Sequence, residues 1–219
     1  MFDPAYLLAQ VPALLGGLGM TLVLTAISML LSLAIGVVGG ALRSQRVPVL
    51  GQLAGAYVEV IRNTPILVQL FFLFYGLPAV GMRMSLFWTG VACLTLWGGG
   101  YQIENFRGGF AAVDRGLREA ALALNLRPLN FLRHVAVPIA LRVSLPSIVN
   151  TAISQLKNSS YLQAIGLAEL TFVALDRVAT DFRALEMFAA LGVTYVALVF
   201  ALSAAAARLE RVMNRPYAT

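Results

Sequence analysis

Hydrophobic residues along this chain gather into five blocks that are separated by more polar stretches. The blocks are residues 18–42, 66–80, 86–103, 143–156 and 185–207. A membrane-spanning helix needs roughly 20 mainly apolar residues, and we interpret each block with its flanking residues as one such helix. The pattern therefore predicts an all-α membrane protein with five transmembrane helices, whose two termini lie on opposite sides of the membrane.

Two segments are predicted to depart from straight spanning helices. The second block follows the more polar segment 52–64, and Pro65 lies between them. Proline lacks the backbone N–H that a helix interior requires, so we expect a break or kink at this point. Segment 161–184 mixes apolar residues with few charges. This composition favours a helix that lies at the membrane surface or re-enters it, not a free loop.

The basic residues predict the orientation of the chain, because cytoplasmic loops of membrane proteins carry an excess of arginine and lysine. An external N-terminus would place twelve arginines on the cytoplasmic side and three outside, with Lys157 within a span. The cytoplasmic set is Arg43, Arg46, Arg62, Arg107, Arg115, Arg118, Arg127, Arg133, Arg142, Arg208, Arg211 and Arg215, and the outer set is Arg83, Arg177 and Arg183. We therefore expect the N-terminus outside and the C-terminus in the cytoplasm, which makes the loop 104–142 cytoplasmic.

Composition agrees with this interpretation. The chain has 219 residues, of which 59% are hydrophobic and 12% charged, and its mean hydropathy is +0.81. A soluble domain carries roughly twice that charged fraction. The net charge of +6 lies in the loops near the hydrophobic blocks, so it fits membrane orientation better than nucleic-acid binding. We expect one transmembrane domain over residues 1–219.

Within the cytoplasmic loop, the sequence predicts two short helices joined by a sharp turn. Asp114 can cap a helix that begins near Arg115, Asn125 can adopt the left-handed conformation that ends it, and Pro128 can open the next helix. Four residues of the first helix share one face at helical spacing: Leu117, Ala120, Ala121 and Leu124. The small alanines would permit a partner to approach closely, although the pattern alone equally fits a loop that packs on its own chain.

The spacing of Glu119, Ala120 and Ala121, followed by Asn125 and later by Val135 and Pro138, resembles the EAA loop of ABC importer permeases. In that family an ATPase subunit grips this loop from the cytoplasm. The resemblance implies that Glu119, Ala120, Ala121, Asn125, Leu117 and Leu124 form the ATPase-coupling surface. The family usually has glycine where this chain has Asn125, and asparagine tolerates the same backbone region.

Four further segments resemble the polar amino acid subfamily of these permeases, in the same order along the chain. They are 59–69 (EVIRNTPILVQ), 104–109 (ENFRGG), 156–160 (LKNSS) and 165–171 (IGLAELT). The resemblance implies a type I ABC importer permease fold in the bacterial inner membrane. It also implies three kinds of partner: a second permease subunit, ATPase subunits that carry ATP and magnesium, and a substrate-binding protein outside the membrane.

Polar residues inside the predicted spans indicate a pathway for a polar solute, because such groups are costly in lipid and usually face a cavity. Gln102 and Glu104 lie near the inner end of the third span, and Gln155, Lys157 and Asn158 lie toward the outer end of the fourth. We predict that Lys157 holds a substrate carboxylate while Asn158, Gln155 and Thr95 supply neutral hydrogen bonds. The subfamily often has aspartate at the position of Asn158, so its absence puts a basic substrate in doubt.

Structural alternatives remain open for three of these features. Lys157 can extend its ammonium to the outer membrane interface, and Glu104 can pair with Arg107, three residues further along the same helix. Gly98, Gly99 and Gly100, which offer a surface without side chains, can serve helix packing instead of ligand approach.

The sequence also argues against catalysis by this chain. It has no G-x-x-x-x-G-K-[ST] phosphate-binding loop, and with His134 as the one histidine and Cys93 as the one cysteine it has no zinc-binding pattern. We therefore expect a transport subunit that holds no cofactor or metal of its own, with ATP hydrolysis on a separate subunit. The alternatives are a stand-alone secondary carrier or channel for small polar solutes, and a membrane scaffold.

Overall fold

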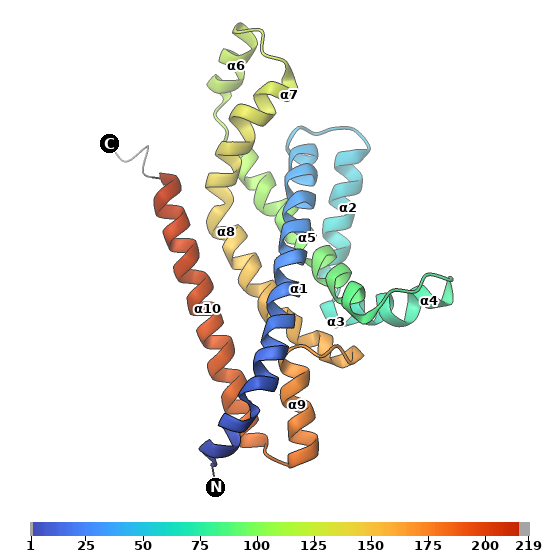
Figure 1. The fold of residues 1–219 in the computed structure, drawn as a ribbon. Coiled ribbons are helices and arrows are strands. Elements are labelled where there is room, and N and C mark those ends of the chain that lie inside the picture. The colour runs from blue at the N-terminus through green and yellow to red at the C-terminus, as the bar shows by residue number, and fades with distance from the viewer. Residues whose placement is uncertain (1, 215–219) are drawn as a thin grey trace. The chain divides into compact units, whose positions relative to one another are not determined.

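The computed structural model describes residues 2–214, and all the secondary structure in this range is helical. Figure 1 shows the helices, whose bounds in chain order are as follows. They are α1 (Pro4–Ser44), α2 (Leu50–Asn63), α3 (Ile66–Phe71), η1 (Phe72–Gly76), α4 (Leu77–Ala79), α5 (Leu86–Ala111), α6 (Arg115–Ala123), α7 (Pro128–Phe131), η2 (Leu132–Ala136), α8 (Val137–Asn158), η3 (Ser159–Ile165), α9 (Leu170–Asp181) and α10 (Ala184–Asn214). The predicted all-α class is confirmed, while Arg215 lies outside the described residues.

The chain divides into two compact units. The first consists of the described parts of Met1–Leu30, Thr64–Thr95 and Ala152–Ala205, and the second of Leu31–Asn63, Leu96–Thr151 and the described part of Ala206–Thr219. Helices α1, α5, α8 and α10 each contribute residues to both units.

In the first unit, the early part of α5 packs in a core with α1, α3 and η3. This core contains Leu24, Leu70, Val91, Cys93, Leu94, Leu162, Ile165 and Leu167. A side chain at Gly90 would meet Leu162 and Leu167, so the glycine lets α5 approach η3 closely. At the other end of this unit, the Asp3 amide donates to the Glu186 carboxylate at 3.2 Å. The starts of α1 and α10 therefore lie side by side.

In the second unit, the later part of α5 is surrounded by α1, α2 and α8. Side chains at Gly36 and Gly40 of α1 would meet Gln102 and Phe106 of α5, so these two helices run in the same direction. A side chain at Gly109 would meet Ala140 and Ser144 of α8. The Asn105 amide also donates to the Thr151 hydroxyl at 3.0 Å, so α8 runs in the opposite direction.

The glycine run of α5 contributes to helix packing. Side chains at Gly99 and Gly100 would meet Tyr57 and Ile61 of α2 respectively, and the Tyr57 hydroxyl donates to the Leu96 carbonyl oxygen at 2.5 Å. Of the two interpretations that the sequence left open, the structure favours helix packing for these two glycines.

Three helical stretches in the described residues are long and apolar enough to cross a membrane, and the predicted spans 18–42, 143–156 and 185–207 fall within them. These stretches are Pro4–Ser44, Pro128–Ile165 and Ala184–Arg211. The second predicted span belongs to a pair of helical segments, Leu50–Asn63 and Ile66–Ala79. The second segment is bent by 107° away from the direction of the first. Pro65 stands at this bend and precedes the first residue of α3, which confirms the predicted break.

Helix α5 holds the third predicted span but does not meet the same criterion of length and hydropathy. Its 26 residues would reach about 39 Å at 1.5 Å per residue. Its lower hydropathy reflects the glycines and the buried Gln102 that face neighbouring helices. In the segment 161–184, the predicted helix is present as α9, which follows the end of η3 and the left-handed Gly166.

Candidate functional site

The loop between α5 and α8 forms the predicted helix, turn and second helix. The Asp114 carboxylate accepts a hydrogen bond from the Gly116 amide at 2.7 Å and caps the start of α6. Arg115 and Glu119 form an ion pair at 3.0 Å on the outer face of this helix. Both side chains are largely exposed, so this pair adds only a few tenths of a kcal/mol. The face that carries Glu119 is therefore free to interact with another protein.

The turn after α6 confirms the left-handed conformation predicted for Asn125. Its backbone is left-handed, with φ at +52°, and the next amide, that of Leu126, donates back to the Ala121 carbonyl oxygen at 2.9 Å. This is the pattern that ends helices through a left-handed residue. Pro128 occupies the first turn of α7, where its missing N–H removes no helical hydrogen bond.

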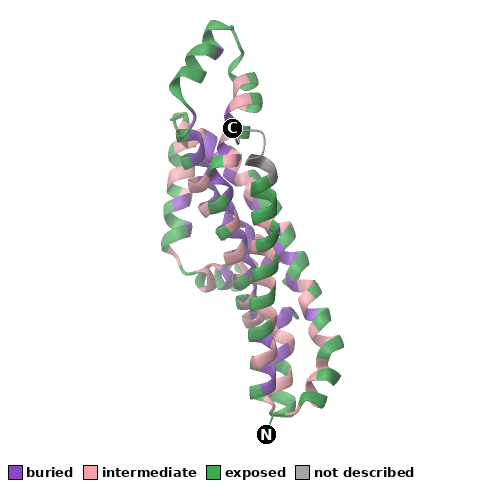
Figure 2. Cartoon of the chain, turned by 90° about the vertical axis from the view of Figure 1, so that its left-hand side faces the viewer, coloured by how far each residue is buried: buried purple, intermediate pink, exposed green. Residues whose placement is uncertain are grey.

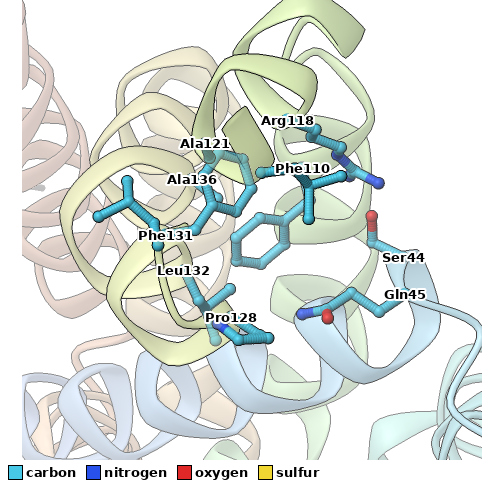
Figure 3. Close-up of a pocket in the computed structure, with 11 residues that line it drawn as sticks. Ser44, Gln45, Phe110, Arg118, Ala121, Pro128, Phe131, Leu132 and Ala136 are labelled. Carbon is cyan, nitrogen blue, oxygen red and sulfur yellow. The ribbon is translucent and has the colours of Figure 1, made fainter. Parts of the chain in front are cut away.

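A pocket of about 200 Å³ lies at the base of this helix–turn–helix and is drawn in Figure 3. It is lined by Ser44, Gln45, Phe110, Arg118, Ala121, Leu122, Leu126, Pro128, Phe131, Leu132 and Ala136. Phe110, Ala121 and Ala136 are buried. The buried Ala121 of α6 thus faces the same pocket as residues at the ends of α1 and α5.

Three leucines of the same loop are largely exposed. Leu122, Leu124 and Leu129 are 76%, 73% and 71% exposed, and Figure 2 shows most of the loop, at the top of the view, in the colour of exposed residues. Of the four residues predicted to share a face, Ala121 is buried in this chain, whereas Leu117, Ala120 and Leu124 are exposed. We call the exposed surface of residues 115–131 the coupling knob.

Four of the predicted pathway residues belong to the first unit. Gln155 is fully buried, and its amide donates to the Leu94 carbonyl oxygen at 3.0 Å, which brings it beside the residue that precedes Thr95. The buried Thr95 hydroxyl has no hydrogen-bond partner among the described residues. Lys157 is exposed, and Asn158 is half-buried at the end of α8.

The other two predicted pathway residues belong to the second unit. Gln102 is fully buried and accepts a hydrogen bond from the Asn105 amide at 3.0 Å. The Glu104 carboxylate pairs with Arg107 at 2.9 Å and also with Arg43 of α1. The pair with Arg107 that the sequence offered as an alternative is therefore present, and the Glu104 charge is balanced within the chain.

A polar pocket of about 300 Å³ in the second unit was not predicted. It is lined by Val58, Glu59, Arg62, Asn63 and Tyr101. The Arg62 guanidinium lies 5.2 Å from the centre of the Tyr101 ring, and the Glu59 carboxylate accepts from the Asn63 amide at 3.1 Å. The signal available in the sequence was the presence of two charged residues just before the Pro65 break.

A buried carboxylate at the start of α9 was also missed. Glu169 caps this helix by accepting hydrogen bonds from the amides of Thr171, at 2.9 Å, and Phe172, at 2.8 Å. The Thr21 hydroxyl lies 3.4 Å from the same carboxylate. Burial raises the pKa of the Glu169 carboxyl, and the two amide hydrogen bonds oppose that rise. Glutamate immediately before an apolar helical segment was the local signal for such a cap.

Within residues 2–214, no group of histidine, cysteine, aspartate and glutamate side chains is suited to hold a metal ion.

The chain is similar to a known protein family and to several of its members. Residues 32–215 match the family described as "Binding-protein-dependent transport system inner membrane component". The glutamine transport system permease protein GlnP of Escherichia coli (strain K12) is 36% identical over 215 residues, which cover 97% of this chain and 98% of that protein. A probable glutamine ABC transporter permease protein of Bacillus subtilis (strain 168) is also 36% identical, over 95% of this chain and 97% of that protein.

The fold is similar to that of solved transporters. A chain in the crystal structure of an amino acid ABC transporter with histidines superimposes with a TM-score of 0.86 and 31% sequence identity, covering 96% of this chain and 99% of that chain. The MetNI methionine ABC transporter in an inward-facing conformation gives a TM-score of 0.80 at 23% identity. The second likeness concerns the fold alone.

Proposed function

This chain belongs to the family of inner membrane components of binding-protein-dependent transport systems, and we propose that it is the permease subunit of an ATP-driven importer for polar amino acids. Its relatives include permeases named for glutamine in Escherichia coli and for cystine and arginine in Bacillus subtilis. Their common substrate class is the amino acid, and the relatives with 36% identity favour an uncharged polar one.

The coupling knob is the observation that carries this proposal. Its leucines are exposed at the end of the loop, while Ala121 is buried at its base. Burying a leucine side chain stabilises an interface by roughly 1.5–3 kcal/mol, so the knob is a surface that gains from a protein partner. We assign this partner as the ATPase subunit, which holds ATP and magnesium, with Glu119, Ala120 and Leu124 at the contact.

The pathway would be formed by two permease subunits, and a binding protein would deliver the solute from outside. ATP-driven closure of the ATPase subunits would move the two coupling knobs and switch the pathway between its two open states. Through the pocket that Ala121 shares with the ends of α1 and α5, this movement would reach the helices. A ligand can shift such an equilibrium only through differential contacts with its two states, and in this chain the knob would supply them.

The directions of the helices support five crossings with the N-terminus outside and the C-terminus in the cytoplasm. Helices α1 and α5 run in one direction and α8 in the other, while α10 starts beside the start of α1. The bent pair α2 and α3–α4 supplies the remaining return crossing between α1 and α5. This arrangement agrees with the excess of arginines on the proposed cytoplasmic side.

For the substrate pathway, we propose contacts from Thr95, Gln155, Lys157 and Asn158, which all belong to the first unit. The unpartnered Thr95 hydroxyl supports this assignment, because a buried polar group without a partner is costly and a passing solute can satisfy it. Glu104 is less suited to hold a substrate ammonium, since two arginines already balance its charge.

The test is ATP hydrolysis by the reconstituted permease with its ATPase, with and without the binding protein and each of a panel of amino acids. Stimulation by one class of amino acid would support the importer and identify its substrate. Solute flux without any bound ATPase would contradict the proposal and favour a stand-alone carrier.

A further inference from the structure

Five arginines line one cavity of about 430 Å³ in the second unit, beside the base of the coupling knob. The complete lining is Arg43, Ser44, Arg46, Arg107, Ala111, Val113, Arg115 and Arg118. These residues come from the end of α1 and the turn after it, the end of α5 with the following residues, and the first turn of α6. We call this cavity the arginine pocket.

The positive charge of the arginine pocket is only partly balanced. Glu104 pairs with Arg43 and Arg107, and Glu119 pairs with Arg115. These ion pairs set two carboxylates against three guanidinium groups, and Arg46 and Arg118 add two more guanidinium groups to the lining. Arg46 and Arg118 are both exposed, and their side chains have no hydrogen-bond or ion-pair partner within the described part of the chain.

The backbone holds Arg46 close to Arg43. Arg46 has a left-handed φ of +52°, and its amide donates to the Arg43 carbonyl oxygen at 3.2 Å. This turn reverses the chain at the end of α1, so two guanidinium groups stay at one edge of the cavity. Guanidinium groups gathered in this way suit phosphate oxygens, which they can bind with two parallel hydrogen bonds.

The ion pair between Arg43 and Glu104 points to the source of the phosphate. Glu104 directly follows the uncharged run 84–103 of the chain, which is long enough as a helix to cross the hydrocarbon core of about 30 Å. The first charged residue after such a run lies at the depth of the lipid head groups. The exposed leucines of the coupling knob, by contrast, belong to residues further along the loop.

We propose that the arginine pocket binds the phosphate of an anionic lipid head group at the cytoplasmic surface of the membrane. The site shares Arg115 and Arg118 with the coupling knob, whereas Arg43, Arg46 and Arg107 lie outside the knob and outside the proposed solute pathway. The negative charge of a bound head group would offset part of the positive charge and hold together the ends of α1, α5 and the start of α6. Acidic side chains of the ATPase are the competing occupant, and the depth of Arg43 favours the lipid.

The test is native mass spectrometry of the full chain with added phosphatidylglycerol or phosphatidylcholine. The double variant Arg46→Gln with Arg118→Gln removes the two unpaired guanidinium groups. Its matched control is Arg127→Gln with Arg133→Gln, which removes two exposed arginines that stand further along the loop and outside the pocket. Each basic residue near an anionic surface contributes about fivefold in affinity. We expect phosphatidylglycerol binding to weaken about 25-fold in the pocket variant and to change little in the control.

Additional arms identify the occupant. Arg46→Lys keeps the charge and should retain most of the phosphatidylglycerol binding, which separates loss of the site from loss of the fold. Equal retention of both lipids by the natural chain, or equal losses in the two double variants, would overturn the proposal. So would displacement of the lipid by inorganic phosphate at equal concentration. Unchanged lipid binding with loss of ATPase binding would assign the pocket to the ATPase interface instead.

Discussion

Helix α5 and the coupling knob follow one another in the chain, yet α5 buries a polar side chain whereas the knob exposes apolar ones. In α5, Gln102 is fully buried and bonded within the protein, and the helix approaches its neighbours through Gly99, Gly100 and Gly109. In the knob, Leu122 and Leu124 are more than 70% exposed. The contacts of α5 in the second unit are complete within one chain, whereas the apolar surface of the knob gains only from a second protein.

This difference predicts that substitutions in the two regions have different effects. Changes in α5 should lower the stability of the chain itself, because they disturb contacts that it already makes. Changes on the outer face of the knob should leave the chain folded and remove its coupling to the ATPase. The four predictions below run from the largest expected effect to the smallest.

Glu119→Lys is expected to abolish ATP-driven uptake while membrane insertion stays normal. The substitution reverses a charge on the exposed face of α6 and removes the ion pair with Arg115, which is worth only a few tenths of a kcal/mol in such a surface position. Uptake of radiolabelled amino acid by proteoliposomes is the measurement. Glu210→Lys, at an exposed position of α10, is the control and should transport normally. Normal uptake by the Glu119 variant would remove this residue from the coupling surface.

Gly109→Ala is expected to lower the stability of the chain by roughly 1–3 kcal/mol, the usual cost of overpacking a close contact. The added methyl group would overlap the Ser144 hydroxyl and the Ala140 backbone. Gly108→Ala is the matched control, because a methyl group there meets nothing within 4 Å. Thermal unfolding in detergent compares the two variants. Equal midpoints would show that α5 does not pack against α8 as described.

Asn125→Val should weaken coupling, since a β-branched residue in the left-handed region costs roughly 1–2 kcal/mol. Asn125→Gly should couple as well as the natural chain or better, because glycine adopts this conformation freely. ATPase affinity of the purified permease separates the variants. An Asn125→Val variant that binds the ATPase normally would mean that the turn is not needed for docking.

Glu169, at the cap of α9, is buried, whereas Glu119 on the coupling knob is exposed. The variant Glu169→Gln tests the consequence of this burial. Because the pKa of the Glu169 carboxyl is raised in the folded chain, the folded state holds its proton more tightly than the unfolded state. Stability should therefore fall as pH rises from the ordinary range of a glutamate carboxyl toward this raised value. The glutamine variant should lose that part of the pH dependence. Identical pH profiles of the unfolding midpoint would contradict the assignment.

The parts of the site that could be predicted from the sequence depend on local backbone chemistry. Asp114, Asn125 and Pro128 each have a strong positional preference within one helical turn, and each stands where it was expected. Pro65 marks the bend for the same reason. Local rules were sufficient because each of these residues acts on backbone groups only a few positions away.

What could not be predicted depends on contacts between distant parts of the chain. Glu104 and Arg43 are 61 positions apart, and no local pattern pairs them. Hydropathy predicted α10 clearly. Only 11% of the most apolar stretch of this helix is buried within the chain, and hydropathy is most informative for a surface that faces lipid. Hydropathy was least informative for α5, because this helix packs against other helices through glycines and the buried Gln102.

The most direct test of the coupling knob is hydrogen–deuterium exchange of the reconstituted permease with and without its ATPase. Our account predicts slower exchange over residues 115–131 when the ATPase is bound, with little change in the buried part of α5, where the backbone is already protected. Unchanged exchange over residues 115–131 in the presence of a bound, active ATPase would contradict the assignment of this loop as the docking surface.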